Sequence, residues 1–122
     1  MAKKLLVVDD DPMGLRLLKD IATVAGHRVI TAINGRQAVE RAWQHIPDLI
    51  LMDVMMPELD GYAALAELKS DEKTRDIPVV ILTASDCGIE KNMAYKLGAA
   101  DFIIKPLNVK HLISRISYHL TR

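Results

Sequence analysis

The chain alternates short apolar runs with segments in which apolar residues recur every three or four positions. The run at 49–52 (LILM) has no polar side chain, which is typical of a strand buried on both faces of a parallel sheet. Asp53 follows it directly, at the point where such a strand ends. Four other runs share this short, apolar character. The pattern predicts five strands, at residues 4–9, 28–32, 49–52, 78–83 and 101–104.

A segment with helical periodicity follows each strand. In the first, Asp11 suits an N-cap, Pro12 suits the first helical turn, and Gly26 suits a helix end. Asn108 is the corresponding cap for the last helix. The expected helices cover residues 12–25, 36–44, 62–70, 88–97 and 109–120.

Three connections have their own signals. Asn34 and Gly35 indicate a turn before the second helix, and Pro47 ends that helix because the residue before a proline avoids the helical region. Residues 71–76 are rich in charge, so we expect a solvated connection there.

Strands and helices in regular alternation predict an α/β fold. Right-handed βαβ crossovers give a five-stranded parallel sheet with helices on both faces, the flavodoxin-like, doubly wound (βα)5 arrangement. A chain of 122 residues is the size of one domain, so we expect a single domain over residues 1–122. Ligand sites in such sheets lie at the carboxyl ends of the strands.

Composition narrows the function classes. Sixteen basic and sixteen acidic residues give zero formal charge, so no overall basic field favours direct contact with nucleic acid. The start of the chain lacks the apolar region of a signal peptide, and no run approaches the length of a membrane span. We therefore expect a cytoplasmic protein with no membrane partner. Cys87 is the single cysteine and the four histidines are scattered, so the sequence does not favour a zinc site.

Polar residues stand at the expected strand ends. They are Asp9 and Asp10 after the first strand, Asp53 after the third, Thr83 after the fourth and Lys105 after the fifth. Three carboxylates in one crevice would repel one another unless a cation is present. A site with oxygen ligands and no sulfur or imidazole suits Mg²⁺. A hydroxyl, an ammonium and a divalent ion around Asp53 would suit a phosphoryl group, with Asp53 as its acceptor.

Each of these residues also has a structural interpretation. The first aspartates could form an N-cap cluster before the helix that starts at Pro12. Thr83 could be an ordinary strand threonine, Lys105 a solvated lysine, and Phe102 a core residue. The methionines at 52, 55 and 56 are typical of packing and not of a cofactor site.

Four motifs together resemble the response-regulator receiver domains of two-component signalling, the CheY-like family. They are VVDDDP, LMDVMMPELDG, the LTA around Thr83 and the IIKP that contains Lys105, and the resemblance covers essentially the whole chain. It implies that Asp53 accepts a phosphoryl group from a sensor histidine kinase or a phosphotransfer protein. It also implies that Mg²⁺ is held by Asp10, Asp53 and the backbone carbonyl of Met55, with Asp9 acting mostly through water.

The resemblance assigns a conformational switch as well. Thr83 and Lys105 would contact the phosphoryl oxygens, Phe102 would be the aromatic switch residue, and Pro106 would follow a cis peptide bond. The surface of the fourth helix, fifth strand and last helix would then bind a downstream effector, act on a fused output domain or form a dimer. On that surface the chain offers charged residues that could also be a solvated face: Lys91, Lys96, Asp101, Lys110 and Arg115.

We expect a signalling switch and not an enzyme, although the protein would slowly remove its own phosphoryl group. The resemblance implies that Met55 and Ser85, two residues past Asp53 and Thr83, flank the path of the attacking water, and an apolar Met55 cannot orient that water. A flavodoxin-like cofactor protein or an aspartate phosphatase is a weaker alternative, because a phosphate loop is missing after the first strand. An interaction scaffold that is never phosphorylated is a third. The switch could be a stand-alone protein or part of a larger regulator.

Overall fold

The computed structural model describes residues 2–54, 60–84 and 88–121. Five strands form one sheet, and all four neighbouring pairs are parallel. The strand order is β2-β1-β3-β4-β5, so the strand that ends in Asp53 lies at the centre. The strands are β1 (Lys4–Val8), β2 (Arg28–Ala32), β3 (Leu49–Asp53), β4 (Val79–Thr83) and β5 (Asp101–Ile104).

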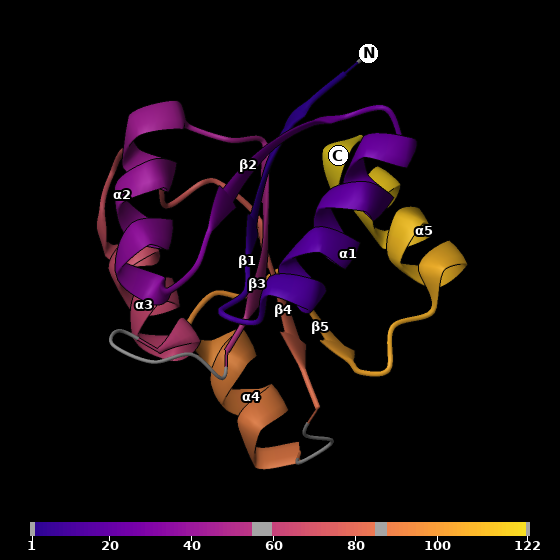
Figure 1. Cartoon of the computed structure of the whole chain (residues 1–122). Helices are drawn as coiled ribbons and strands as arrows, with labels where there is room; N and C mark the ends of the chain where they lie inside the picture. The colour runs from indigo at the N-terminus through magenta and orange to yellow at the C-terminus, as the bar shows by residue number, and fades with distance from the viewer. Residues whose placement is uncertain (1, 55–59, 85–87, 122) are drawn as a thin grey trace.

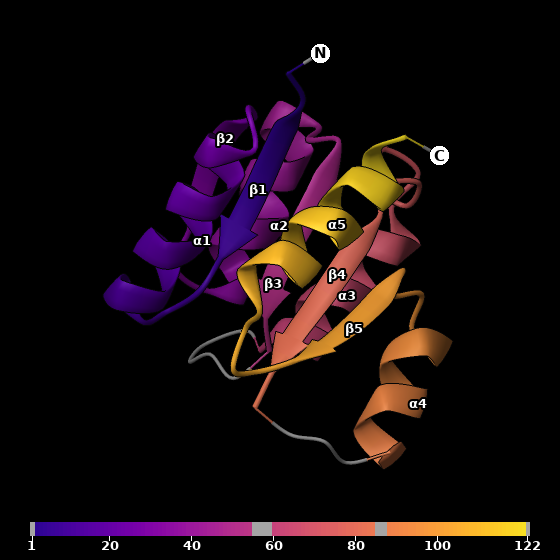
Figure 2. The ribbon, with the colours of Figure 1, turned by 90° about the vertical axis from the view of Figure 1, so that its right-hand side faces the viewer.

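Helices cover both faces of the sheet, which confirms the predicted fold class. Figure 1 shows the sheet nearly edge-on, with α2 and α3 on one side and α1 and α5 on the other, and Figure 2 shows α1 and α5 in front of the strands. Among the described residues, no helix has the length and apolarity that crossing a bilayer requires. The helices are α1 (Pro12–Val24), α2 (Gly35–His45), α3 (Gly61–Ser70), α4 (Gly88–Lys96) and α5 (Val109–Leu120).

The central strand separates two apolar clusters. Ile50 and Met52 pack with α2, α3 and α4, whereas Leu49 and Leu51 pack with α1 and α5. All four side chains are 0% exposed. Each such burial stabilises the fold by about 1.5–3 kcal/mol. The strand is apolar throughout because helices cover both of its faces. Asp53, which follows this run, therefore lies at the carboxyl end of the central strand.

Helix α2 begins earlier than the sequence indicates. Asn34 is its N-cap, with Oδ1 accepting a hydrogen bond from the Gln37 backbone N–H at 2.8 Å, so Gly35 is helical and not part of a turn. The helix ends at His45, one residue beyond the expected range, and its C-cap Ile46 adopts a left-handed conformation with φ of 46°. Asp11, Asp60 and Asn108 cap α1, α3 and α5 by the same side-chain to backbone mechanism.

The α3–β4 connection is only partly the solvated segment that its charges predict. Thr74 is 2% exposed, and its hydroxyl donates to the Leu68 carbonyl at 2.7 Å. Lys69 donates to the carbonyl of Ile77 at 2.6 Å. Buried carbonyl groups need donors, and these two side chains supply them. The expected solvated connection is confirmed for the other five residues of 71–76, which are exposed, and Thr74 is the exception because its hydroxyl bonds a backbone carbonyl.

Candidate functional site

The carboxyl edge of the sheet brings together residues from four segments. The backbone N–H of Asp9 continues the pairing of β1 with β2 by donating to the Ala32 carbonyl at 3.1 Å. Asp53 is the last residue of β3, and Thr83 is the last residue of β4. The backbone N–H of Lys105 donates to the Thr83 carbonyl at 2.7 Å. Strand register therefore places all four residues at one edge.

Lys105 connects the two buried carboxylates. Its Nζ lies 2.7 Å from Asp53 Oδ2 and 3.8 Å from Asp9 Oδ2. The side chains of Asp9 and Asp53 are 2% and 10% exposed, and that of Lys105 is 30% exposed. The Lys105–Pro106 peptide bond is cis, which confirms that part of the prediction. The amine thus enters the crevice from its open side and contacts both acids.

At this edge of the sheet, two carboxylates, Asp9 and Asp53, lie beside one ammonium group, that of Lys105. Burial raises the pKa of Asp9, and the negative charge of Asp53 adds to this, although the Asp11 backbone N–H opposes it by donating to Asp9 Oδ1 at 3.0 Å. Burial by itself would lower the pKa of Lys105, but the hydrogen bond and charge of Asp53 outweigh it, so that pKa is raised. The site therefore favours additional positive charge.

These residues fit a hydrated Mg²⁺ ion. Within the three described segments, no group of three or more His, Cys, Asp or Glu side chains is arranged to hold a metal. Mg²⁺ does not require such a group, because it commonly uses one or two carboxylates and keeps several waters. Asp9 and Asp53 provide buried carboxylates, and Asp10 is exposed in the turn that follows β1. The remaining expected ligand, the carbonyl of Met55, lies outside the described residues, as does Ser85.

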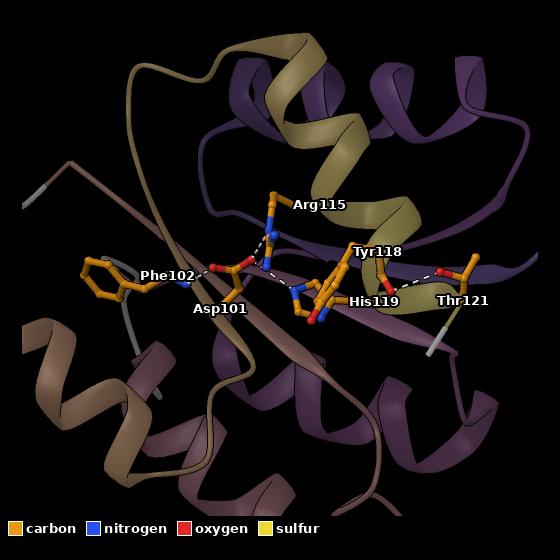
Figure 3. Close-up of polar contacts among 6 residues, drawn as sticks. All are labelled: Asp101, Phe102, Arg115, Tyr118, His119 and Thr121. Carbon is orange, nitrogen blue, oxygen red and sulfur yellow. Dashed lines mark hydrogen bonds and ion pairs between the residues drawn. The ribbon is translucent and has the colours of Figure 1, made fainter.

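The two expected switch residues are both buried. Thr83 is 1% exposed, and Phe102 is 8% exposed within the cluster that includes α4. Figure 3 shows the Phe102 ring directed away from Asp101, although its backbone N–H donates to Asp101 Oδ1 at 2.9 Å. The core interpretation of Phe102 therefore holds for this conformation. The sequence prediction that Phe102 changes position is not tested by it.

Asp101 and Arg115 pair with each other and are not simply a solvated face. Arg115 Nε lies 2.6 Å and His119 Nε2 lies 3.0 Å from Asp101 Oδ2 (Figure 3). Burial would raise the pKa of Asp101, but the hydrogen bonds from His119 and Arg115 outweigh it, so the pKa is lowered. We missed this cluster in the sequence, where the i, i+4 spacing of Arg115 and His119 was the available signal.

A close backbone approach beside Asp53 is a second feature that was not predicted from the sequence. A Cβ atom on Gly61 would lie 2.5 Å from Val54 Cα and 3.0 Å from the Asp53 carbonyl oxygen. The Gly61 backbone N–H donates to the Val54 carbonyl at 3.2 Å. Only glycine lets the start of α3 pack this closely against the end of β3. The available signal in the sequence is the glycine that ends the LMDVMMPELDG motif, directly before the helix expected at 62–70.

Known proteins resemble this chain in sequence and in fold. The family model described as response regulator receiver domain matches residues 5–117. Response regulator PleD of Caulobacter vibrioides is 40% identical over 116 residues, which are 95% of this chain and 26% of PleD. The chain spans about a quarter to a half of the length of the curated relatives it matches.

Solved structures give the same result. The receiver domain of a histidine kinase from Syntrophus aciditrophicus has a TM-score of 0.91 and 38% identity, with 98% of this chain and 91% of that one covered. The receiver domain of the sensor histidine kinase PA1611 from Pseudomonas aeruginosa, described with magnesium coordinated in its active site cleft, has a TM-score of 0.92 and 29% identity over both full chains. On this evidence the chain belongs to the response regulator receiver domains of two-component signalling.

Proposed function

We propose that Asp53 accepts a phosphoryl group from the phosphohistidine of a sensor histidine kinase or of a phosphotransfer protein. The observation that supports this most strongly is the Lys105 amine, 2.7 Å from Asp53 and 3.8 Å from Asp9. A fixed ammonium beside the acceptor carboxylate supplies the positive charge that a transferred phosphoryl group requires. The same arrangement is of no evident use to an unphosphorylated scaffold.

In the transfer step, an Asp53 carboxylate oxygen attacks phosphorus in line with the leaving imidazole. The P–O bond forms as the P–N bond breaks, and the electron pair of that bond stays on the imidazole nitrogen. The product is an acyl phosphate on Asp53. The Lys105 ammonium and the Thr83 hydroxyl then lie at the correct strand ends to contact the phosphoryl oxygens.

Mg²⁺ is the cofactor in this proposal. Asp10, Asp53 and the Met55 backbone carbonyl would hold the ion, with Asp9 acting through water. When bound, Mg²⁺ would offset the negative charge between the acceptor carboxylate and the phosphoryl oxygens. Burial and the negative charge of Asp53 both raise the pKa of Asp9, and a bound cation would offset both effects, which supports this assignment.

Phosphorylation would act as a switch. The phosphoryl group adds about 1.5–2 negative charges, which would draw the Thr83 hydroxyl towards Asp53. The space that Thr83 leaves would admit the ring of Phe102, which lies on the neighbouring strand, paired with Ile81. Movement of Phe102 would change the surface formed by α4, β5 and α5. A ligand shifts such an equilibrium only through its different affinity for the two states.

That surface would pass the signal on. We propose that it contacts a downstream effector protein, an output domain in the same polypeptide or a second receiver, and that the chain itself does not bind nucleic acid. The fraction of each curated relative that the chain spans is compatible with a fused output domain. A cytoplasmic location remains a prediction from the sequence.

The phosphorylated state should be long-lived. Met55 would not orient a water molecule for attack on the acyl phosphate, so self-dephosphorylation would take many minutes. Met55→Asn supplies a hydrogen-bonding side chain and should shorten the lifetime, as measured by loss of label after acetyl phosphate is removed. A wild-type half-life of seconds would contradict this part of the proposal.

A labelling experiment tests the central claim. The protein is incubated with acetyl phosphate and Mg²⁺, and intact mass spectrometry should detect one added phosphoryl group that is stable to acid and released by hydroxylamine. Asp53→Asn should abolish the adduct. Asp20→Asn is the matched control, because Asp20 is an exposed carboxylate whose side chain is 65% accessible. Failure of the wild type to label, or labelling of Asp53→Asn at the wild-type rate, would overturn the proposal.

A further inference from the structure

Gly14 lies unusually close to one of the acids of the site. It is the third residue of α1, and an ideal Cβ atom on it would lie well inside 3.0 Å of Asp9 Oδ2 and 3.1 Å from Asp9 Cγ. Cβ atoms essentially never approach another heavy atom more closely than 3.0 Å. The Asp9 carboxylate therefore occupies space that any other residue at position 14 would fill.

The Asp9 carboxylate has little freedom to move out of that space. It is 2% exposed, and its Oδ1 accepts a hydrogen bond from the Asp11 backbone N–H at 3.0 Å. Its Oδ2, the atom that faces Gly14, also lies 3.8 Å from Lys105 Nζ. A shift of Oδ2 would thus change the contact between Asp9 and the amine that holds Asp53.

Rotation of a side chain at position 14 could not relieve the collision. Gly14 lines a cavity of about 240 Å³ together with Asp9, Leu17, Leu18 and Lys105, so atoms beyond Cβ could find room there. The Cβ atom itself is fixed by the helix backbone, however, and does not move with χ1. The absence of Cβ, and not the small volume of glycine, is therefore what matters here.

A glycine in this helix needs a reason. Within a helix it costs about 1 kcal/mol relative to alanine, and Gly14 has no left-handed backbone conformation that would favour it. We propose that Gly14 is a positioning residue, which keeps the Asp9 carboxylate in contact with Lys105 beside the phosphoacceptor. The expected effect on phosphorylation rests on the proposed function of Asp53. The close approach of Gly14 to the Asp9 carboxylate does not depend on that function.

A double-mutant cycle tests the geometry without any phosphorylation. Urea unfolding midpoints are compared for Gly14→Ala in the wild-type protein and in Asp9→Ala, in buffer without divalent ions. With Asp9 present, alanine at 14 should lower the midpoint because Cβ displaces the carboxylate. In Asp9→Ala it should raise the midpoint, because alanine favours the helix. Equal shifts in both backgrounds would overturn the inference.

The second measurement is the initial rate of labelling by acetyl phosphate over a range of Mg²⁺ concentrations. Gly14→Ala should label more slowly than wild type by at least about threefold, since small displacements in a reacting site are costly. Gly88→Ala is the control, because a Cβ there meets no atom of the described residues within 4 Å, and it should label at the wild-type rate.

The two failures are distinguishable. If Gly14→Ala labels as fast as wild type, the positioning role is wrong, although the phosphoacceptor proposal stands. If the wild type does not label, the proposed function of Asp53 fails, and the urea cycle still decides whether Gly14 positions Asp9.

Discussion

Two regions of the molecule each pair carboxylates with nitrogen-bearing side chains, but in opposite proportions. At the carboxyl edge of the sheet, the described residues place two acids, Asp9 and Asp53, beside Lys105. Between β5 and α5, the described residues place two nitrogen side chains, Arg115 and His119, on the single acid Asp101. The pKa of Asp9 is raised and that of Asp101 is lowered.

The opposite ratios of acids to nitrogen-bearing side chains distinguish the candidate functional site from a structural contact between β5 and α5. A carboxylate whose charge is already satisfied gains little from another cation, so the Asp101 cluster serves to hold α5 on β5. At the carboxyl edge, two carboxylates lie within 4 Å of one ammonium, and a hydrated metal ion would add positive charge there. Burial and the excess of acids over cations together distinguish the carboxyl edge from the Asp101 cluster.

The largest expected effect comes from exchanging the cations for apolar residues. Lys105→Met removes a charge that contacts the acceptor, so labelling of Asp53 by acetyl phosphate should slow by about 10²-fold. Arg115→Met removes a comparable ion pair in the other region and should leave the labelling rate within about twofold of wild type. The measurement is the initial rate by intact mass spectrometry. Equal losses in both variants would break the distinction between the regions.

An intermediate effect, on the free energy of unfolding, is expected when Asp101 or Asp9 is replaced by asparagine. Asp101→Asn weakens two hydrogen bonds to nitrogen donors and should lower the free energy of unfolding by about 1–3 kcal/mol. Asp9→Asn removes a buried charge near Asp53, so it should leave that free energy unchanged or raise it. Urea unfolding in buffer without divalent ions measures both. A loss in Asp9→Asn as large as that in Asp101→Asn would contradict our interpretation of the charge imbalance.

The smallest effect is a dependence on pH. Because the pKa of Asp101 is lowered below 3.8 in the fold, its contribution is fully present above pH 3.8 and is lost as pH falls through the folded value. The stability advantage of wild type over Asp101→Asn should therefore persist above pH 3.8 and shrink below it. Arg115, His119 and Tyr95 also face this carboxylate. The comparison is repeated in His119→Gln, which lacks the imidazole. An advantage that grew with falling pH in that background would disprove the assignment.

The sequence predicted the site residues because their positions follow from the strand pattern. Asp53 and Thr83 each end an apolar run, and Lys105 follows another, so a parallel sheet places them at one edge. The boundaries of α2 were less certain, because Asn34 followed by glycine is compatible with a turn or with an N-cap. A side-chain hydrogen bond to Gln37 decided between them.

Contacts between side chains far apart in the chain could not be predicted from the strand pattern. The sequence contains Asp101 and His119 as separate charged or polar positions, and their 3.0 Å contact depends on how α5 crosses β5. In the sequence, Gly14 is an ordinary residue of the helix expected at 12–25, and Gly61 directly precedes the helix expected at 62–70. Both positions need glycine because an added Cβ atom would collide with Asp9 Oδ2 or Val54 Cα. Those atoms belong to the residues that directly follow β1 and β3.

The amino-acid sequence by itself determined the order of strands and helices, the central position of an apolar strand and the set of polar residues at the strand ends. These follow from local periodicity and from the rule that parallel strands end at a common edge. The tertiary structure alone decided how the charges are shared: Lys105 between two acids, and Asp101 between two nitrogen donors. Electrostatic balance depends on distances of a few ångströms between side chains far apart in the chain, and only folding sets those distances.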